Sequence, residues 1–242
     1  MDFHEERCAL AAAFRWAFRL GWHEAVANHF SLSVSDNGQV FLMNPAGLHF
    51  SRITASDLIV CDANDREATF AGTAVPDPTA WGIHGAFHRH LPHARACLHV
   101  HAVNATALSC LQDPTLPPVD QNTARFFRRF GYDDGYGGMG FASEGERLSQ
   151  TLGTNRILLM GNHGVMAAAE SVARAFDELY YFERACETYL KAASTGLSLK
   201  VLSDDIAEKT AREWEDYPDA PWQTHFDALC AILDEEEPDF RS

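Results

Sequence analysis

The chain has 242 residues, and 46% of them are hydrophobic, which is enough to bury a sizeable core in a single domain. Its formal net charge of −15 excludes a basic surface for nucleic acid or an anionic membrane, and no apolar stretch is long enough to span a bilayer. The six cysteines are scattered without a CxxC pair, and the first residues lack the basic start of a secretion signal. We therefore expect a cytoplasmic protein with reduced thiols and a small-molecule substrate, and no nucleic-acid or membrane partner.

The first predicted elements are one helix and two short strands. Apolar residues recur at helical spacing over residues 5–20, and Gly21 ends the pattern. Residues 29–34 and 40–43 have the alternation of strands and flank a hairpin-type turn. We expect these two strands to pair in antiparallel fashion.

The rest of the chain alternates predicted helices with short strands. Helical patterns occupy residues 79–90, 104–109, 143–152 and 171–193, and strand patterns occupy residues 58–61, 94–102 and 156–160. This alternation predicts a layered α/β or α+β domain. The glycines of residues 135–140 match the letters of a dinucleotide fingerprint, but the preceding residues 126–134 are charged and aromatic rather than a buried strand. We interpret this segment as a loop.

Two histidines in the apolar run of residues 94–102 suggest a metal site. His99 and His101 are two positions apart, so on a strand both imidazoles point to the same face. Imidazole suits zinc, iron, manganese or cobalt, and catalytic sites typically use three protein ligands with one position left open. The alternative is that both are ordinary residues of a half-buried strand. His163 follows the strand pattern of residues 156–160, but its position alone is a weak indication of a third ligand.

A second group of histidines competes for the metal. His84 and His88 lie one helical turn apart on the same face, and His90 and His93 follow them. The spacing is that of HExxH, but the intervening residues are Gly-Ala-Phe, so the glutamate base of a zinc protease is absent. This group is therefore the less favoured metal site.

Taken in order, these segments resemble the class II aldolase and adducin family over roughly residues 7–196. The motifs that carry the resemblance are Asn28-His-Phe-Ser31, Asn44-Pro-Ala-Gly47, residues 53–58, His84 ahead of His99-Val-His101, and Asn162-His163-Gly164. The resemblance implies an α/β fold, a single three-layer α/β/α domain with a central, mainly antiparallel sheet over residues 1–200. Residues 201–242 are then an acidic C-terminal extension packed on the same domain.

The resemblance also implies which residues form the site. It makes His163 the third metal ligand beside His99 and His101, and it implies a homotetramer with active sites at subunit interfaces. The candidate substrate-binding residues are Asn28, His29, Ser31, Gly47 and Gln121.

One departure from the family concerns proton transfer. In the family's sugar-phosphate aldolases, a glutamate four residues before the position of His84 acts as acid and base, and here that position is Ala80. A methyl group cannot transfer protons, so the aldolase mechanism does not carry over intact. The candidate replacements are Asp77, His84, Asp120 and Tyr132. Each has a structural alternative: Asp77 caps the next helix, Asp120 holds a loop, and Tyr132 packs at a subunit contact.

A second departure concerns phosphate. The two serines that help to hold phosphate in the aldolases align with Pro78 and Thr79, so a non-phosphorylated substrate is expected. The expected function is a divalent-metal lyase of aldolase or decarboxylase type acting on a hydroxy-carbonyl or oxo-acid. Zn²⁺ is the expected ion, with Fe²⁺, Mn²⁺ or Co²⁺ as alternatives. Alternative functions are an Fe(II)-dependent oxygenase on the same fold and a non-catalytic adducin-like interaction domain.

Overall fold

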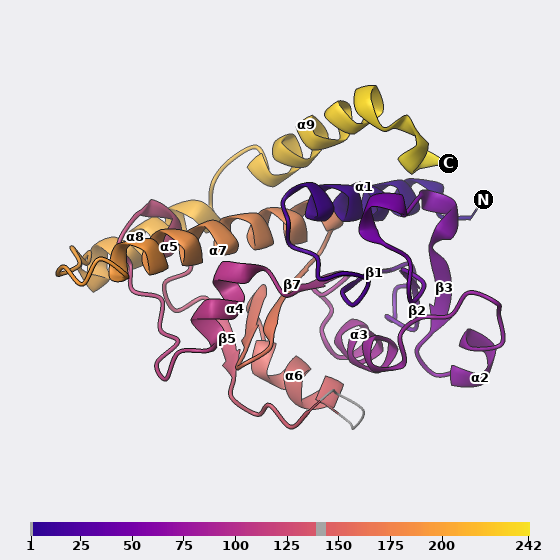
Figure 1. Ribbon diagram of the computed structural model, residues 1–242, viewed down its shortest axis with the longest axis horizontal. Coiled ribbons are helices and arrows are strands. Elements are labelled where there is room, and N and C mark those ends of the chain that lie inside the picture. The colour runs from indigo at the N-terminus through magenta and orange to yellow at the C-terminus, as the bar shows by residue number, and fades with distance from the viewer. Residues whose placement is uncertain (1, 139–143) are drawn as a thin grey trace.

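A central sheet organises the chain. The computed structural model describes residues 2–138 and 144–242 (Figure 1). Within them, seven strands form one sheet in the order β3-β2-β1-β4-β7-β6-β5. Neighbouring strands are antiparallel except β5 and β6, so the predicted mainly antiparallel sheet is confirmed. The strands are β1 (His29–Ser33), β2 (Val40–Met43), β3 (Ile59–Asp62), β4 (Ala96–Val100), β5 (Phe130–Asp133), β6 (Ile157–Met160) and β7 (Gly164–Ala169).

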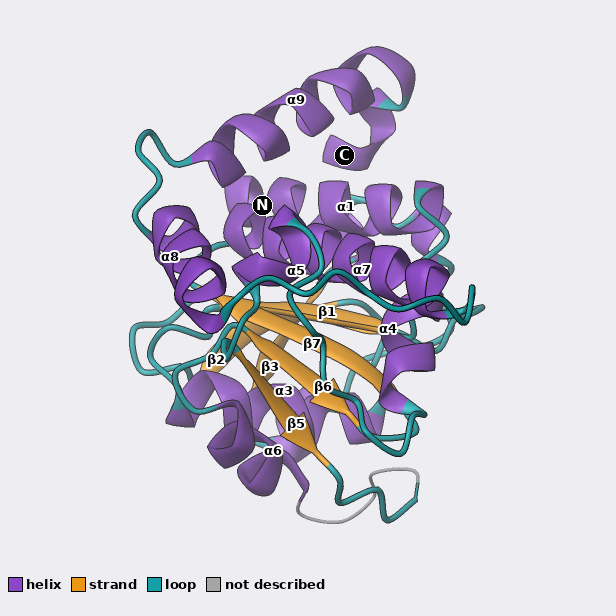
Figure 2. Cartoon of the chain, turned by 90° about the vertical axis from the view of Figure 1, so that its left-hand side faces the viewer, coloured by secondary structure: helices purple, strands orange, loops and turns teal. Residues whose placement is uncertain are grey.

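Helices cover both faces of this sheet. They are α1 (His4–Arg19), α2 (Arg66–Thr69), α3 (Pro78–His90), α4 (Val103–Ser109), α5 (Gln121–Arg125), α6 (Glu144–Leu152), α7 (Val172–Ala193), α8 (Asp204–Glu215) and α9 (Pro221–Glu236), with 3-10 turns η1 (Phe50–Arg52), η2 (Ala55–Asp57) and η3 (Pro238–Arg241). Figure 2 shows α3 and α6 on one face, α1, α5 and α7 on the other, and α9 outside this second layer. The predicted three-layer α/β/α architecture is therefore confirmed.

The alternation of β4 decides which side chains reach each layer. Leu98 and Val100 belong to the larger core cluster, which includes residues of α1 and α7. Cys97 belongs to the opposite cluster, which includes residues of α3 and α6. Since side chains on a strand alternate between its faces, His99 shares the face of Cys97 and points to the α3 and α6 side of the sheet.

Two strands correct the sequence interpretation. Residues 126–134 were not interpreted as a buried strand, and the structure adds a half-buried strand there, because β5 pairs with β6 at the edge of the sheet. Alternate β5 residues are only half-buried, so the segment lacks a continuous apolar run. Strand β7 was not predicted either, because its small residues are buried on both faces and show no alternation. The predicted start of helix α6 at residue 143 and the last two positions of the glycine-rich segment lie outside the described residues.

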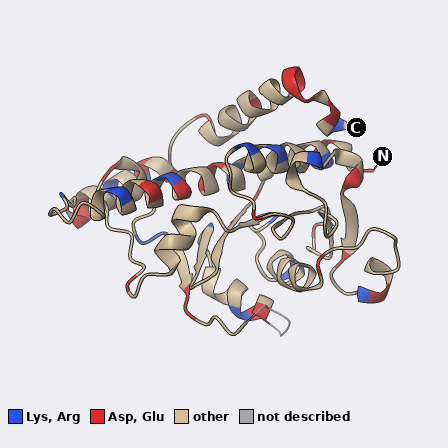
Figure 3. Ribbon diagram, viewed as in Figure 1, with Lys and Arg blue, Asp and Glu red and all other residues tan. Residues whose placement is uncertain are grey.

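Ion pairs join the last helices to the first one. Arg15 on α1 contacts both Glu237 and Asp239 at 2.8 Å, and Arg19 contacts Glu236 at 2.8 Å. Figure 3 shows the acidic residues gathered where α9 ends, close to the N-terminal helix. The division of the chain at residue 200 stays a prediction. Among the helices of the described residues, none combines the length and apolarity needed to cross a membrane.

Candidate metal centre

Three histidines lie together, two from the end of one strand and one from a turn. His99 is on β4, His101 follows it directly, and His163 lies in the turn between β6 and β7. Because β4 and β7 are antiparallel neighbours, the end of β4 meets the start of β7. The ring centroids of each pair are 4.9 Å apart, and the ligand atoms lie within 4.8 Å of one another. The structure thus brings together the three residues predicted as metal ligands.

Hydrogen bonds fix the proton positions on two of these rings. Nδ1 of His99 lies 3.0 Å from the carbonyl oxygen of Val165, which can only accept, so Nδ1 carries the proton. Nδ1 of His101 contacts the carboxylate of Glu24 in the same way. In each neutral ring, Nε2 then carries a lone pair.

The two lone pairs face each other. The Nε2 atoms of His99 and His101 are 3.1 Å apart, and neither carries a proton in these tautomers. Such a pair repels unless a proton or a cation lies between its members, so this donor set fits a divalent metal ion. Burial lowers the pKa of His99 well below its ordinary value, and burial together with His101 lowers that of His163 to about 4. Both rings are therefore neutral near pH 7, which is the form that ligates metals.

A cavity of about 360 Å³ opens on this cluster. Besides the three histidines, two of the other predicted site residues, His29 and Asp77, line it. The remaining lining residues are Ala27, Thr79, Ile83, Tyr136, Gly138, Glu144, Met160, Asn162 and Met166. Nine of these fourteen lining residues have polar side chains, so the cavity can bind and orient a small polar molecule.

Asp77 caps a helix and also lines the cavity. Its carboxylate caps α3 by accepting hydrogen bonds from the backbone N–H of Thr79 at 2.8 Å and of Ala80 at 3.1 Å, and it also lines the cavity. Burial acts to raise the pKa of Asp77, but these hydrogen bonds lower it overall below its ordinary value. The Asp77 carboxylate is therefore ionised at neutral pH.

The other three acid/base candidates lie elsewhere. His84 is fully buried and contacts His29 rather than the cavity. Asp120 caps α5 by accepting from the backbone N–H of Thr123 at 2.8 Å. The hydroxyl of Tyr132 on β5 donates to a neighbouring carboxylate. None of these three is among the described residues that line the cavity.

The predicted substrate-binding residues are dispersed. His29 lines the cavity, whereas Ser31 lies behind it and contacts His84. Asn28 accepts a hydrogen bond from the backbone N–H of Glu24 at 2.7 Å, so it supports the segment that holds His101. Gly47 has a φ of +80° in the turn after β2, and Gln121 is the exposed first residue of α5. These two positions are outside the described lining of the cavity.

Besides Thr79, which lines the cavity at the start of α3, four polar residues of the site were not predicted. Tyr136, Glu144 and Asn162 line the cavity, and Glu24 orients His101. They come from loops or helix ends, where no periodicity or motif marks a functional residue. Ala80, at the position of the family's glutamate, packs in a small apolar cluster with Phe41 and other residues.

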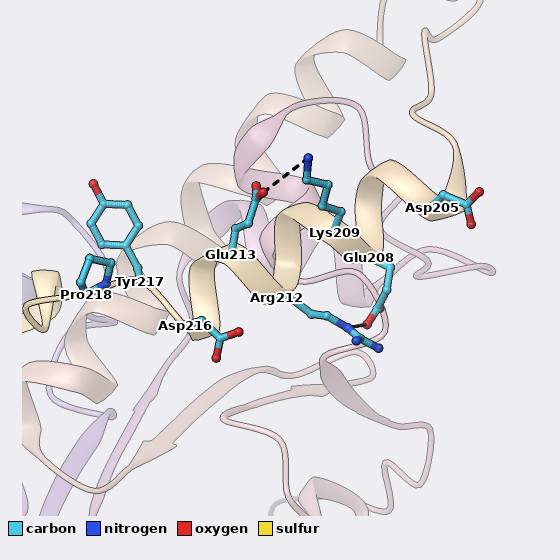
Figure 4. Close-up of a pocket in the computed structure, with 8 residues that line it drawn as sticks. All are labelled: Asp205, Glu208, Lys209, Arg212, Glu213, Asp216, Tyr217 and Pro218. Carbon is cyan, nitrogen blue, oxygen red and sulfur yellow. Dashed lines mark hydrogen bonds and ion pairs between the residues drawn. The ribbon is translucent and has the colours of Figure 1, made fainter.

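A second concave surface lies on α8 and has a different character. Four of its six charged side chains pair along the helix, Lys209 with Glu213 at 3.7 Å and Arg212 with Glu208 at 2.7 Å (Figure 4). Exposed pairs of this kind are typical of a solvated helix face. The side chains of this surface do not converge on one point as the histidine cluster does.

Comparisons with known proteins agree with this fold. The sequence profile of the Class II Aldolase and Adducin N-terminal domain matches residues 8–190. A solved aldolase II superfamily protein from Pseudomonas syringae is 32% identical with a TM-score of 0.86, over 99% of this chain and 96% of that one. The adducin-related protein of Schizosaccharomyces pombe is 31% identical over 213 residues, which are 84% of this chain and 65% of the relative. An L-fuculose 1-phosphate aldolase from Glaciozyma antarctica is similar in fold, with 20% identity and a TM-score of 0.82 over 99% of this chain and 92% of that one.

The profile match covers most of the chain, from the first helix through all three clustered histidines into the long helix α7. The resemblance drawn from the sequence motifs is therefore confirmed: the chain belongs to the class II aldolase and adducin family.

Proposed function

We propose that this protein is a divalent-metal lyase of aldolase or decarboxylase type. The observation that carries the proposal is the convergence of the Nε2 atoms of His99 and His101, 3.1 Å apart, beside His163 in a cavity. A divalent cation held by these residues would supply Lewis-acid polarisation of substrate oxygens. Zn²⁺ is the proposed ion because three imidazoles suit it, with Fe²⁺, Mn²⁺ and Co²⁺ as alternatives.

Two carboxylates in the cavity are the proposed proton-transfer groups. Asp77 is the one of the four predicted candidates that lines the cavity, and Glu144 lines it from the start of α6. Asp77 is ionised and held by its helix cap, so it is positioned to accept a proton from a substrate carbon or hydroxyl. These groups take the place of the carboxylate that Ala80 lacks.

The charge of the cavity supports a non-phosphorylated substrate. Its described lining contains the carboxylates of Asp77 and Glu144 and neither a lysine nor an arginine. A phosphate dianion next to two carboxylates would be repelled, whereas a neutral hydroxy-aldehyde would not. We therefore propose a small hydroxy-carbonyl or oxo-acid compound. The cation would balance the single negative charge of an oxo-acid. A cytoplasmic homotetramer with active sites between subunits stays part of this proposal.

Metal analysis combined with one substitution tests the proposal. Purified protein should contain a stoichiometric divalent metal by mass spectrometry, and His101→Ala should lose both this metal and the release of aldehyde or CO₂ from a panel of hydroxy-carbonyl and oxo-acid compounds. His90→Ala is the matched control, because His90 is exposed at the end of α3 and does not line the cavity. Turnover by metal-free protein would contradict a metal lyase.

The same preparation separates the alternative functions. An Fe²⁺-dependent oxygenase consumes O₂ when the protein is loaded with iron, and a lyase does not. A non-catalytic adducin-like domain should be purified with negligible metal and should cleave none of the compounds. Either result would replace the lyase proposal.

A further inference from the structure

A continuous hydrogen-bonded chain runs from the cavity into the core. Nδ1 of His29 lies 2.7 Å from Nε2 of His84, and Nδ1 of His84 contacts Oγ of Ser31. The same Oγ lies 2.7 Å from Nε2 of His88, whose Nδ1 lies 2.7 Å from the carbonyl oxygen of Ala94. All four side chains are at most 8% exposed, so water does not compete along the chain.

The carbonyl at the inner end sets the direction of every hydrogen bond. A carbonyl oxygen only accepts, so Nδ1 of His88 donates, and the neutral ring then accepts from Ser31 at Nε2. The single hydroxyl proton of Ser31 is thereby used, so Ser31 accepts from Nδ1–H of His84. Nε2 of His84 in turn accepts, and the donor must be Nδ1–H of His29.

The two inner rings are neutral, as this assignment requires. Burial lowers the pKa of His84 well below its ordinary value. Burial also lowers the pKa of His88 to about 4. A protonated, doubly donating imidazole is therefore excluded at these two positions near pH 7, and each of the two rings has one donor and one acceptor.

We propose that Ser31, His84 and His88 are positioning residues that fix His29 as its Nδ1–H tautomer and leave the Nε2 lone pair for the cavity. His29 lines the cavity, and the hydrogen bonds of the described residues engage only its Nδ1. Nε2 thus accepts a hydrogen bond from a substrate hydroxyl. This hydrogen bond from a substrate to Nε2 rests on the proposed function. The assignment of the Nδ1–H tautomer of His29 does not rest on it.

A metal site within the same group is the competing explanation. Donor atoms of His84, His88 and Cys97 lie within 4.8 Å of one another. However, both nitrogens of each of these two rings already have a hydrogen-bond partner. Burial also raises the pKa of the Cys97 thiol, so it stays protonated and does not act as a thiolate ligand. The hydrogen bonds therefore give all four ring nitrogens of His84 and His88 a partner without an ion.

Removing the inner end of the chain should reverse its polarity. In His88→Phe, the hydroxyl of Ser31 loses its acceptor and is free to donate to Nδ1 of His84. His84 then carries its proton on Nε2 and donates to His29, which must hold its own proton on Nε2. Ser31→Ala cuts the chain and leaves His29 with no fixed tautomer. Ser33→Ala is the matched control, because Ser33 is buried on the same strand but donates to the backbone of Ser35.

Solid-state NMR of ¹⁵N-histidine-labelled protein measures the tautomer directly, with the His29 signals assigned by their loss in His29→Gln. The full chain is measured after EDTA treatment and again with Zn²⁺ added. The wild type and Ser33→Ala should show the Nδ1–H form, and His88→Phe should show the Nε2–H form. In Ser31→Ala the single Nδ1–H form should be replaced by a mixture, which keeps a test available if His88→Phe does not fold.

The opposite results overturn the proposal. An Nε2–H form of His29 in the wild type contradicts the assigned polarity. An unchanged Nδ1–H form in His88→Phe, or in Ser31→Ala, shows that the chain does not fix the tautomer. These outcomes are independent of lyase activity, so a failure of the proposed function would leave this measurement unaffected.

Discussion

His29 on β1 lies directly opposite His99 on β4, with their ring centroids 4.8 Å apart. This pair connects the histidine cluster of the cavity to the buried chain that runs through Ser31 to His88. Because the two strands are held in one register, His99 and His29 keep a constant separation. The proposed role of His29 in the cavity therefore depends on residues that do not reach the cavity.

Replacement of Glu24 by alanine should weaken metal binding about 10- to 100-fold, because its carboxylate orients His101 and residues of this kind contribute that much to metal affinity. Competition between the protein and a chromogenic chelator for Zn²⁺ measures the change. Glu67→Ala is the control, since Glu67 is exposed on α2 away from the cavity. Equal Zn²⁺ affinity of the wild type and Glu24→Ala would show that Glu24 does not support the ligand.

Two glycine substitutions should have opposite effects on stability. A Cβ at Gly164 would lie 2.7 Å from the carbonyl oxygen of Val100 and 2.8 Å from the ring of His101, so Gly164→Ala should lower both thermal stability and metal content. A Cβ at Gly82 in α3 has no neighbour within 4 Å, and alanine favours a helix by about 0.5–1 kcal/mol. Gly82→Ala should therefore raise the free energy of unfolding in urea by a similar amount. Intact metal binding in Gly164→Ala would contradict the close packing of β4 and β7.

Patterns within one segment of the sequence were sufficient to predict several helices and strands. The alternation of β4 placed His99 and His101 on one face, and the helical period of residues 171–193 agrees with α7 (Val172–Ala193). Asp77 followed by Pro78 marks the start of α3 as predicted from helix-capping chemistry. In these cases the spacing of residues along the chain carries the whole signal.

Contacts between distant segments could not be predicted in this way. Glu24 reaches His101 across 77 positions, and Ser31 reaches His88 across 57. Neither contact produces a periodic pattern in the sequence, because each depends on how β1 and the segment before it pack against other elements. The family resemblance supplied His163 as a candidate ligand. The direction of the buried hydrogen bonds could be assigned only from the position of the Ala94 carbonyl beside His88.

A buried ion pair should make stability depend on acid pH. Asp177 contacts Arg125 at 2.8 Å and His225 at 3.0 Å. Burial acts to raise the pKa of Asp177, but the hydrogen bonds from these two partners lower it overall. A carboxyl whose pKa is lowered on folding stabilises the fold above its unfolded pKa, about 3.9, and loses this contribution as pH falls through the folded value.

The variant Asp177→Asn removes this contribution and leaves Arg125 with Glu178, 3.1 Å away, as its buried carboxylate partner. The cost should therefore be below the about 3–5 kcal/mol that is typical when a buried pair loses one partner. Urea unfolding should show this loss at pH 7 and a smaller difference from the wild type below about pH 4. Asp227→Asn on the exposed side of α9 should show neither effect. A loss that is equally large at both pH values would mean that the ionised carboxylate is not the cause.

Asp77→Asn separates the structural role of Asp77 from its proposed chemical role. Asparagine caps helices about as well as aspartate, so α3 should keep its start and the free energy of unfolding should change little. Loss of the carboxylate should lower kcat about 10²- to 10⁴-fold if Asp77 transfers a proton. Asp120→Asn is a matched control, because Asp120 is also an aspartate helix cap, at the start of α5, and lies outside the described lining of the cavity. Full activity of Asp77→Asn on a cleaved substrate would leave Asp77 as a cap only and would transfer the proton-transfer role to Glu144.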